Sequence, residues 1–171
     1  LAAADLGGAT GTALFYATTD AGVFGFAARN ALLPGAWPQA GSAPLPMTGP
    51  ALGDVDGDGA IEVVSGGDDG RLWAWHADGS GAAGFPITTG VWPLRAAPSL
   101  SDLDGVPGVE VIVAAVDGTV HAYGAGGAPN WLVKIGPNPR SPVVTRLGSD
   151  PSPTVVVAAG NQPHAFSPAG M

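Results

Sequence analysis

Four acidic residues lie within the stretch DVDGDGAIE, residues 54–62, of a 171-residue chain in which only 12% of residues are charged. The spacing puts aspartates at positions 1, 3 and 5, a glycine at position 6 for a sharp turn, and a glutamate at position 9. Oxygen ligands at odd-numbered positions are typical of loops that wrap Ca²⁺, and the cation would offset the repulsion among the carboxylates. The predicted ligands of one calcium ion are the side chains of Asp54, Asp56, Asp58 and Glu62 and the backbone carbonyl of Ala60.

Other interpretations of this loop fit its residues less well. Mg²⁺ prefers few carboxylates and several waters. An EF-hand needs a glutamate at position 12, where this chain has Ser65, and a helix on each side, whereas the β-branched stretch IEVVSGG (61–67) predicts a strand. A solvated acidic turn, in which Asp and Gly serve turn geometry alone, is the alternative to metal binding.

A second acidic loop keeps part of the pattern. Asp102, Asp104 and Glu110 hold positions 1, 3 and 9, but Val106 replaces the position-5 carboxylate and Pro107 replaces the glycine. A calcium site that lacks one carboxylate and the turn glycine is weaker. Whether this loop binds a second calcium ion is therefore left open.

The acidic loops recur because the chain repeats one unit. Four stretches share a common pattern of apolar and turn residues: 12–30, 61–79, 109–127 and 154–170. Asp5, Asp54 and Asp102 begin the loops at a spacing in the forties, and such a period with several strands per unit is typical of a β-propeller. In the last unit Arg146 takes the equivalent position, and its fixed positive charge argues against a metal there.

Each unit is expected to contain four short strands. An inner strand ends in the acidic loop, an apolar second strand follows, an Asp-Gly pair (Asp69-Gly70, Asp117-Gly118) makes a two-residue hairpin turn, and a third strand leads to an outer segment. The 28 glycines and 17 prolines argue against long helices. We predict an all-β chain, a partial β-propeller of about 3.5 four-stranded blades that further blades or another protein complete. The expected blades of this single segment, 1–171, are about 1–49, 50–96, 97–140 and an incomplete 141–171.

The third strand alternates large and small side chains. In the second unit Trp73 and Trp75 point to one face, and Leu72 and Ala74 to the other. This pattern predicts a sheet covered on both faces, with the aromatic face of one blade packed on the small-residue face of the next. The aromatic side chains are therefore assigned to the core in preference to carbohydrate stacking.

The stretch PALGDVDGDGAIEVVSGGDDGRLWAWHADGSGAAGFP, residues 50–86, resembles an FG-GAP/VCBS-type repeat, the blade unit of integrin-α-like β-propellers. The resemblance is best over 50–96, fair over 97–136, and weaker over 1–49 and 141–171. It implies calcium in the loop between the first two strands, an extracellular or surface location, and a role in adhesion or as a non-catalytic module. The implied ligands are Asp54, Asp56, Asp58, Ala60 and Glu62, and in part Asp102, Asp104 and Glu110.

A second stretch, VDGTVHAYGAGGAPNW (116–131), is similar to the repeat of quinoprotein-like propellers. In those repeats a closing tryptophan docks against the neighbouring blade, and Trp131 has that place here. No set of residues that would contact a quinone cofactor is identified.

The composition argues against several function classes. The net charge is −8 and the six basic residues are scattered, so nucleic acid is not an expected partner. The apolar runs are too short to span a bilayer, and the chain has no cysteine. No nucleophile motif is present, and His76, His121 and His164, all assigned to third strands, are given packing roles ahead of metal or general-base roles.

These features together predict a calcium-binding propeller module, not an enzyme, that serves protein–protein interaction or structural assembly. Its expected location is extracellular, on the cell surface or in the periplasm, where calcium is abundant enough for a weak loop site. The alternative is a catalytic or non-catalytic segment of a secreted enzyme, polysaccharide-active or quinoprotein-like, which leaves carbohydrate open as a ligand.

Overall fold

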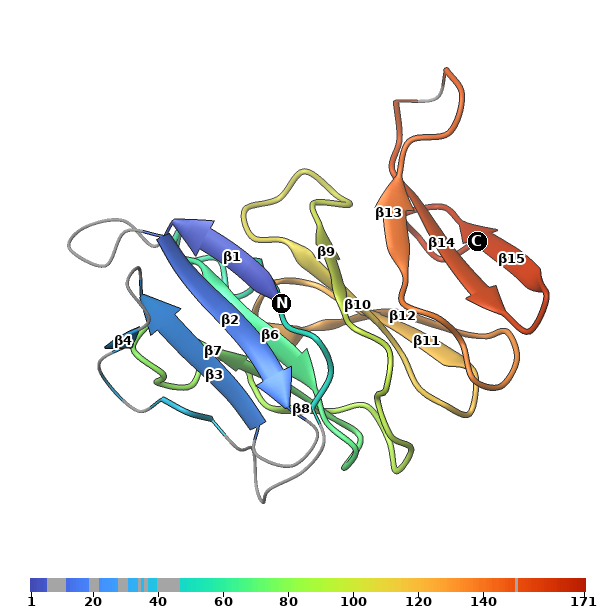
Figure 1. Ribbon diagram of the computed structural model, residues 1–171. Helices are drawn as coiled ribbons and strands as arrows, with labels where there is room; N and C mark the ends of the chain where they lie inside the picture. Colours follow the sequence, from blue (N-terminus) through green and yellow to red (C-terminus); the bar gives the residue numbers. More distant parts are fainter. Residues whose placement is uncertain are drawn as a thin grey trace.

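The computed structural model describes residues 1–5, 12–18, 22–27, 31–33, 35, 37–39, 47–149 and 151–171, and within these ranges it contains four antiparallel sheets (Figure 1). The first sheet consists of β1 (Ala2–Asp5), β2 (Thr12–Thr18), β3 (Gly22–Ala27) and β4 (Ala31–Leu32). The second consists of β5 (Ala51–Gly53), β6 (Glu62–Gly66), β7 (Arg71–Trp75) and β8 (Ile87–Thr88). The third consists of β9 (Ser99–Ser101), β10 (Glu110–Ala114), β11 (Thr119–Tyr123) and β12 (Pro129–Lys134). The fourth consists of β13 (Val143–Thr145), β14 (Thr154–Ala159) and β15 (Gln162–Phe166).

The strands of each sheet pair in chain order, so every sheet is a simple meander. The first strand of each sheet lies next to the first strand of the neighbouring sheet: β5 contacts both β1 and β9, and β9 also contacts β13. The sheets therefore follow one another about a common inner edge, from blue through green and yellow to red in Figure 1. The all-β prediction is confirmed. In the described part of the chain the one helical element is the single 3₁₀ turn η1 (Ala125–Gly127), and no helix is long and apolar enough to cross a membrane.

The Asp-Gly turns differ from the two-residue turns expected. Gly70 takes a φ of +74° and Gly118 one of +93°, whereas the preceding aspartates do not have positive φ. The Gly67 N–H donates to the Arg71 carbonyl at 2.9 Å, which closes a loop of three residues and not two. This is the three-residue hairpin in which a turn is followed by one left-handed residue, and glycine takes that position without strain.

The core lies between the sheets and not on one side of them. The second strands β6 and β10 are buried along their whole length. Val63 packs in the layer between the first and second sheets, while its neighbour Val64 packs in the layer between the second and third. Successive residues of a strand point to opposite faces, so a strand that is apolar throughout suits a sheet covered on both sides.

The third strands pack aromatic face on small-residue face as their alternation predicts, but onto the preceding sheet and not the next one. Trp75, which is 4% exposed, joins the layer against the first sheet, whereas Leu72 and Ala74 join the opposite layer. Tyr123 of the third sheet packs in that same layer. The aromatic face of one sheet thus lies on the small-residue face of the sheet before it, and Trp75 belongs to the core and is not a surface platform for sugars.

Two tryptophans of the outer segments dock on the following unit. The Trp37 indole N–H donates to the Ala77 carbonyl at 2.8 Å, and the Trp131 indole N–H donates to the Pro168 carbonyl at the same distance. The Trp131 ring also lies 6.0 Å from the Phe166 ring, centroid to centroid. The docking expected of Trp131 on the fourth unit is therefore present, and Trp37 of the first unit makes the same kind of contact with the second.

Candidate metal centre

The loop between β5 and β6 is folded by its own aspartates. The two carboxylate oxygens of Asp54 accept hydrogen bonds from the Gly57 N–H at 2.7 Å and the Gly59 N–H at 3.0 Å. Both glycines have positive φ, of +82° and +88°. The tight turn permitted by glycine lets one carboxylate cap two backbone amides, and the following acidic side chains are thereby brought to the same side.

The loop gathers the predicted carboxylates into one group. Asp54, Asp56, Asp58 and Glu62 each offer an oxygen, and these oxygens all lie within 4.8 Å of one another. One Asp58 oxygen accepts the Ala60 N–H at 2.7 Å. The ligand role of the Ala60 carbonyl, like the calcium ion itself, stays a prediction.

Glu62 is fully buried at the start of β6. Its Oε2 accepts the Val55 N–H at 3.0 Å, and its Oε1 lies 3.1 Å from Nδ1 of His76. Burial raises the pKa of the Glu62 carboxyl above its ordinary value, the hydrogen bond from Val55 lowers it, and the negative charge of Asp56 raises it again. A cation beside the loop would favour the ionised carboxylate against this desolvation.

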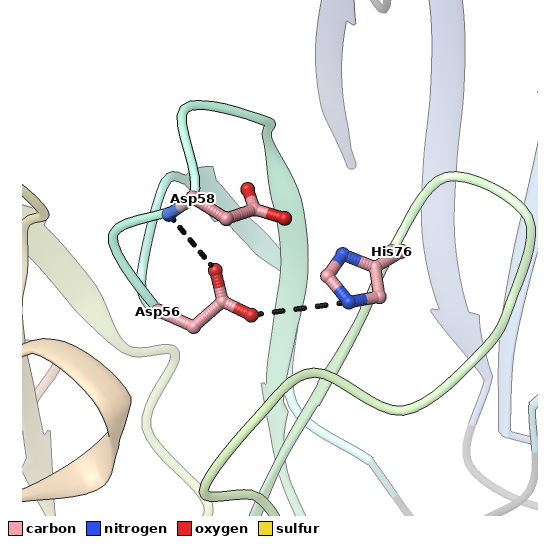
Figure 2. Close-up of side chains that lie close together, drawn as sticks. All are labelled: Asp56, Asp58 and His76. Atoms are coloured by element: carbon pink, nitrogen blue, oxygen red, sulfur yellow. Dashed lines mark hydrogen bonds and ion pairs between the residues drawn. The ribbon is translucent and has the colours of Figure 1, made fainter.

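His76 is a member of the site that the sequence interpretation missed. It follows β7 directly, and because β6 and β7 pair Val63 with Trp75, Glu62 and His76 come side by side at the end of the ladder. Its Nε2 faces Asp56 Oδ2 at 3.8 Å, and Figure 2 shows the imidazole and the carboxylates of Asp56 and Asp58 turned toward one another.

The repeat itself carries a signal for His76. The equivalent positions of the other three units are held by Ala27, Gly124 and Ser167. The histidine thus occurs only in the unit that has the complete acidic loop. The other two histidines, His121 and His164, take the place that Trp73 holds in the second unit, and each stacks on an aromatic ring.

The second acidic loop, between β9 and β10, repeats part of this arrangement. Asp102, Asp104 and Glu110 offer oxygens within 4.8 Å of one another. Glu110 is buried, and its Oε2 accepts the Leu103 N–H at 2.6 Å, as Glu62 does from Val55. Exposed Val106 stands where the first loop has Asp58, so this group has one carboxylate fewer and no imidazole.

The fourth unit has Arg146 where the second unit has Asp54. Arg146 follows β13, and its Nε donates to the Pro151 carbonyl at 2.8 Å within the same loop. The side chain of Asp5 in the first unit lies outside the described residues.

The first acidic loop is fastened to the third sheet. The Val109 N–H donates to the Asp54 carbonyl at 2.8 Å, and the Gly126 N–H donates to the Val55 carbonyl at the same distance. The Val55 side chain is fully buried in the layer between the second and third sheets. A cation bound by this loop would therefore act directly on the contact between two sheets.

Solved structures with the same arrangement identify the fold. The chain is similar to BamB from Moraxella catarrhalis, with a TM-score of 0.60 and 21% identity over 99% of this chain and 45% of that one. It is also similar to BBS1N in complex with ARL6DN, from a mercury-soaked crystal (TM-score 0.59, 19% identity, 92% and 47% of the two chains). A third similar structure is the V. cholerae biofilm matrix protein Bap1 (TM-score 0.54, 16% identity, 98% and 36%). The fold is that of a β-propeller.

At these identities the likeness concerns the fold alone, and the four sheets are the blades of this propeller. The chain spans less than half the length of each of the three similar structures. No family model matches the chain, so the FG-GAP/VCBS resemblance stays a prediction from the sequence. No curated protein matches it either.

Proposed function

We propose that the chain is part of a protein-interaction propeller, stabilised by a divalent cation in the loop 54–62, that works outside the cytoplasm. The observation that carries the proposal is the one-sided burial of β14. Val155 and Val157 are buried against the third blade and Ala159 on the same face is buried too, whereas Thr154, Val156 and Ala158 on the opposite face are only half-buried. The corresponding strands β6 and β10 are buried on both faces.

The open face of the fourth blade is apolar enough to take a partner. Val143 pairs with Val156 on this face and is exposed, and Leu147 beyond the end of β13 is exposed too. Exposed apolar residues that gather on one face are typical of interaction sites. The partner that fits is another blade, either of a longer chain or of another subunit. The three buried apolar clusters of the described residues all lie between one blade and its neighbour.

The similar structures support a role in interaction and assembly. BBS1N was solved in complex with ARL6DN, and Bap1 is a biofilm matrix protein. The acidic loop supports a cation-stabilised module of FG-GAP/VCBS type, and a loop site of weak affinity suits a calcium-rich compartment outside the cytoplasm.

Light scattering coupled to size exclusion tests the interaction. The 16.7 kDa chain is expected to associate, and Val156→Lys, on the open face, is expected to yield the folded monomer. Val91→Lys, between β8 and β9 of the second blade where the side chain is 86% exposed, is the matched control that should still associate. A wild-type chain that is a stable folded monomer at all concentrations would contradict the proposal.

Calorimetric titration with Ca²⁺ tests the cation. Asp58→Asn is the suitable variant because it removes a charge while its amide oxygen can still accept the Ala60 N–H. Wild type is expected to bind calcium and to melt at a higher temperature with it, and the variant is expected to lose both effects. An identical melting curve of wild type in calcium and in chelator would refute the calcium part of the proposal.

A further inference from the structure

We propose that Asp56, Asp58 and His76 form a binding site for a divalent first-row transition-metal ion, with Zn²⁺ as its best-suited occupant. The inference deepens the cation site of the proposed function, from which it takes two ligands, and it commits to a different class of metal. The three residues each offer a ligand atom, and these atoms lie within 4.8 Å of one another. They come from two separate segments, the loop after β5 and the residue after β7.

The distances suit direct coordination by a small ion. Nε2 of His76 and Oδ2 of Asp56 are 3.8 Å apart, which is too far for a hydrogen bond. Two ligands at about 2.0–2.1 Å from a tetrahedral zinc ion are roughly 3.4 Å from each other. A shift of less than half an ångström would bring the pair to that separation, and Figure 2 draws the present contact between Asp56 and His76 as a dashed line.

Glu62 holds the imidazole as a metal ligand requires. Nδ1 of His76 lies 3.1 Å from Glu62 Oε1, and in the tautomer that carries its proton on Nδ1 the imidazole donates this hydrogen bond to the carboxylate. The lone pair is then on Nε2, which faces Asp56. A histidine that gives its other N–H to a carboxylate is the usual arrangement around metal-binding histidines. Here Glu62 is a positioning residue, because its two oxygens already bond to Val55 and His76.

The other blades supply an internal comparison. The third blade keeps the two loop aspartates and the buried glutamate, but it replaces Asp58 by Val106 and His76 by Gly124. The two side chains that distinguish this site are thus missing together, as expected if they serve one ion.

The chemistry of the ligands selects the metal. Imidazole nitrogen suits zinc and other late first-row ions, whereas Ca²⁺ takes oxygen ligands almost exclusively. The Asp56 side chain is 4% exposed and that of His76 is 28% exposed, so the site opens on one side. Three protein ligands and one open position are the usual coordination of a zinc ion that also holds a water molecule.

Competition titrations with Zn²⁺ and Ca²⁺ on the folded chain test the proposal. His76→Ala should weaken Zn²⁺ binding by more than 100-fold and leave Ca²⁺ binding unchanged. Glu62→Gln should weaken Zn²⁺ binding by about 10–100-fold, the usual loss when an orienting group is changed. His164→Ala, a half-buried histidine on β15, is the matched control and should bind Zn²⁺ like wild type. With Co²⁺ in place of Zn²⁺, the visible absorption band of the bound metal should change in His76→Ala and should stay as in wild type in His164→Ala.

The outcomes separate this inference from the proposed function. Wild type that binds Ca²⁺ but not Zn²⁺ overturns the inference and leaves the calcium proposal standing. Equal Zn²⁺ affinity in wild type and His76→Ala also overturns it. Binding of neither ion overturns both. If His76→Ala does not fold by circular dichroism, Asp58→Asn, at an exposed position, replaces it, and unchanged Zn²⁺ affinity there overturns the inference as well.

Discussion

The substitution Leu72→Ala tests whether the stability of the chain lies in the layers between the blades. Leu72 is fully buried on β7, in the layer that also holds Leu94 and Tyr123. The change removes three carbon atoms, and at about 0.8 kcal/mol for each buried methylene the lost transfer free energy is roughly 2.4 kcal/mol. A residual cavity adds to this, so about 3 kcal/mol of unfolding free energy should be lost, within the usual range for buried leucines.

The measurement is a thermal scan of wild type and variant. In a chain of this size about 3 kcal/mol corresponds to a melting temperature roughly 6–12 °C lower. Leu132→Ala is the matched control, because Leu132 on the outer strand β12 is 62% exposed. It should change the unfolding free energy by less than about 0.5 kcal/mol. Equal melting temperatures for the two variants would refute the reasoning that the core lies between the sheets.

Three further predictions concern a buried histidine, a docking tryptophan and a turn glycine. Burial lowers the pKa of His121 below its ordinary 6.5, so on acidification the unfolded chain takes up this proton first and the folded state loses stability as the pH falls below 6.5. In urea titrations at pH 7.5 and pH 5, His121→Phe should therefore lose less unfolding free energy than wild type between the two pH values. Equal losses in the two proteins would contradict this. Trp131→Phe removes the hydrogen bond to Pro168 and should cost about 1 kcal/mol in the same assay, and no loss would argue against docking. Gly118→Ala would bring its methyl group against the Gly136 carbonyl at a φ of +93°, so it should cost at least 1–2 kcal/mol, and a neutral change would mean that the turn can rearrange.

Much of the fold follows from local patterns that can be identified in the sequence alone. The alternation of large and small residues around Trp73 and Trp75 determines which face meets which neighbour, because residues two apart on a strand share a face. The strand after the acidic loop is apolar throughout, which a sheet covered on both sides requires. The acidic loop is equally local, so the spacing of its aspartates alone predicts that their carboxylates gather.

The partner of Glu62 could not be derived in the same way. Contact between Glu62 and His76 depends on the register of β6 and β7, and the turn between these strands sets that register. A two-residue turn at Asp69-Gly70 would pair Val63 with His76. The three-residue loop observed pairs Val63 with Trp75 and so brings His76 beside Glu62. A difference of one residue in the length of this turn therefore decides whether His76 lies opposite Val63 or beside Glu62 in the acidic site.

The position of the acidic site means that a cation bound there would also stabilise the contact between blades. The site joins three parts of the chain, because Asp56 faces His76 and also accepts the Ala83 N–H at 3.2 Å. Its loop is bonded to the third blade through Val55 and Asp54. In the unfolded chain these groups are apart, so an ion that needs all of them binds the folded state. At 100 times its dissociation constant such an ion adds about 2.7 kcal/mol, which is close to the cost expected for Leu72→Ala. The saturating ion should therefore return the melting temperature of Leu72→Ala nearly to that of ion-free wild type, whereas a loop that binds no ion would leave the deficit unchanged.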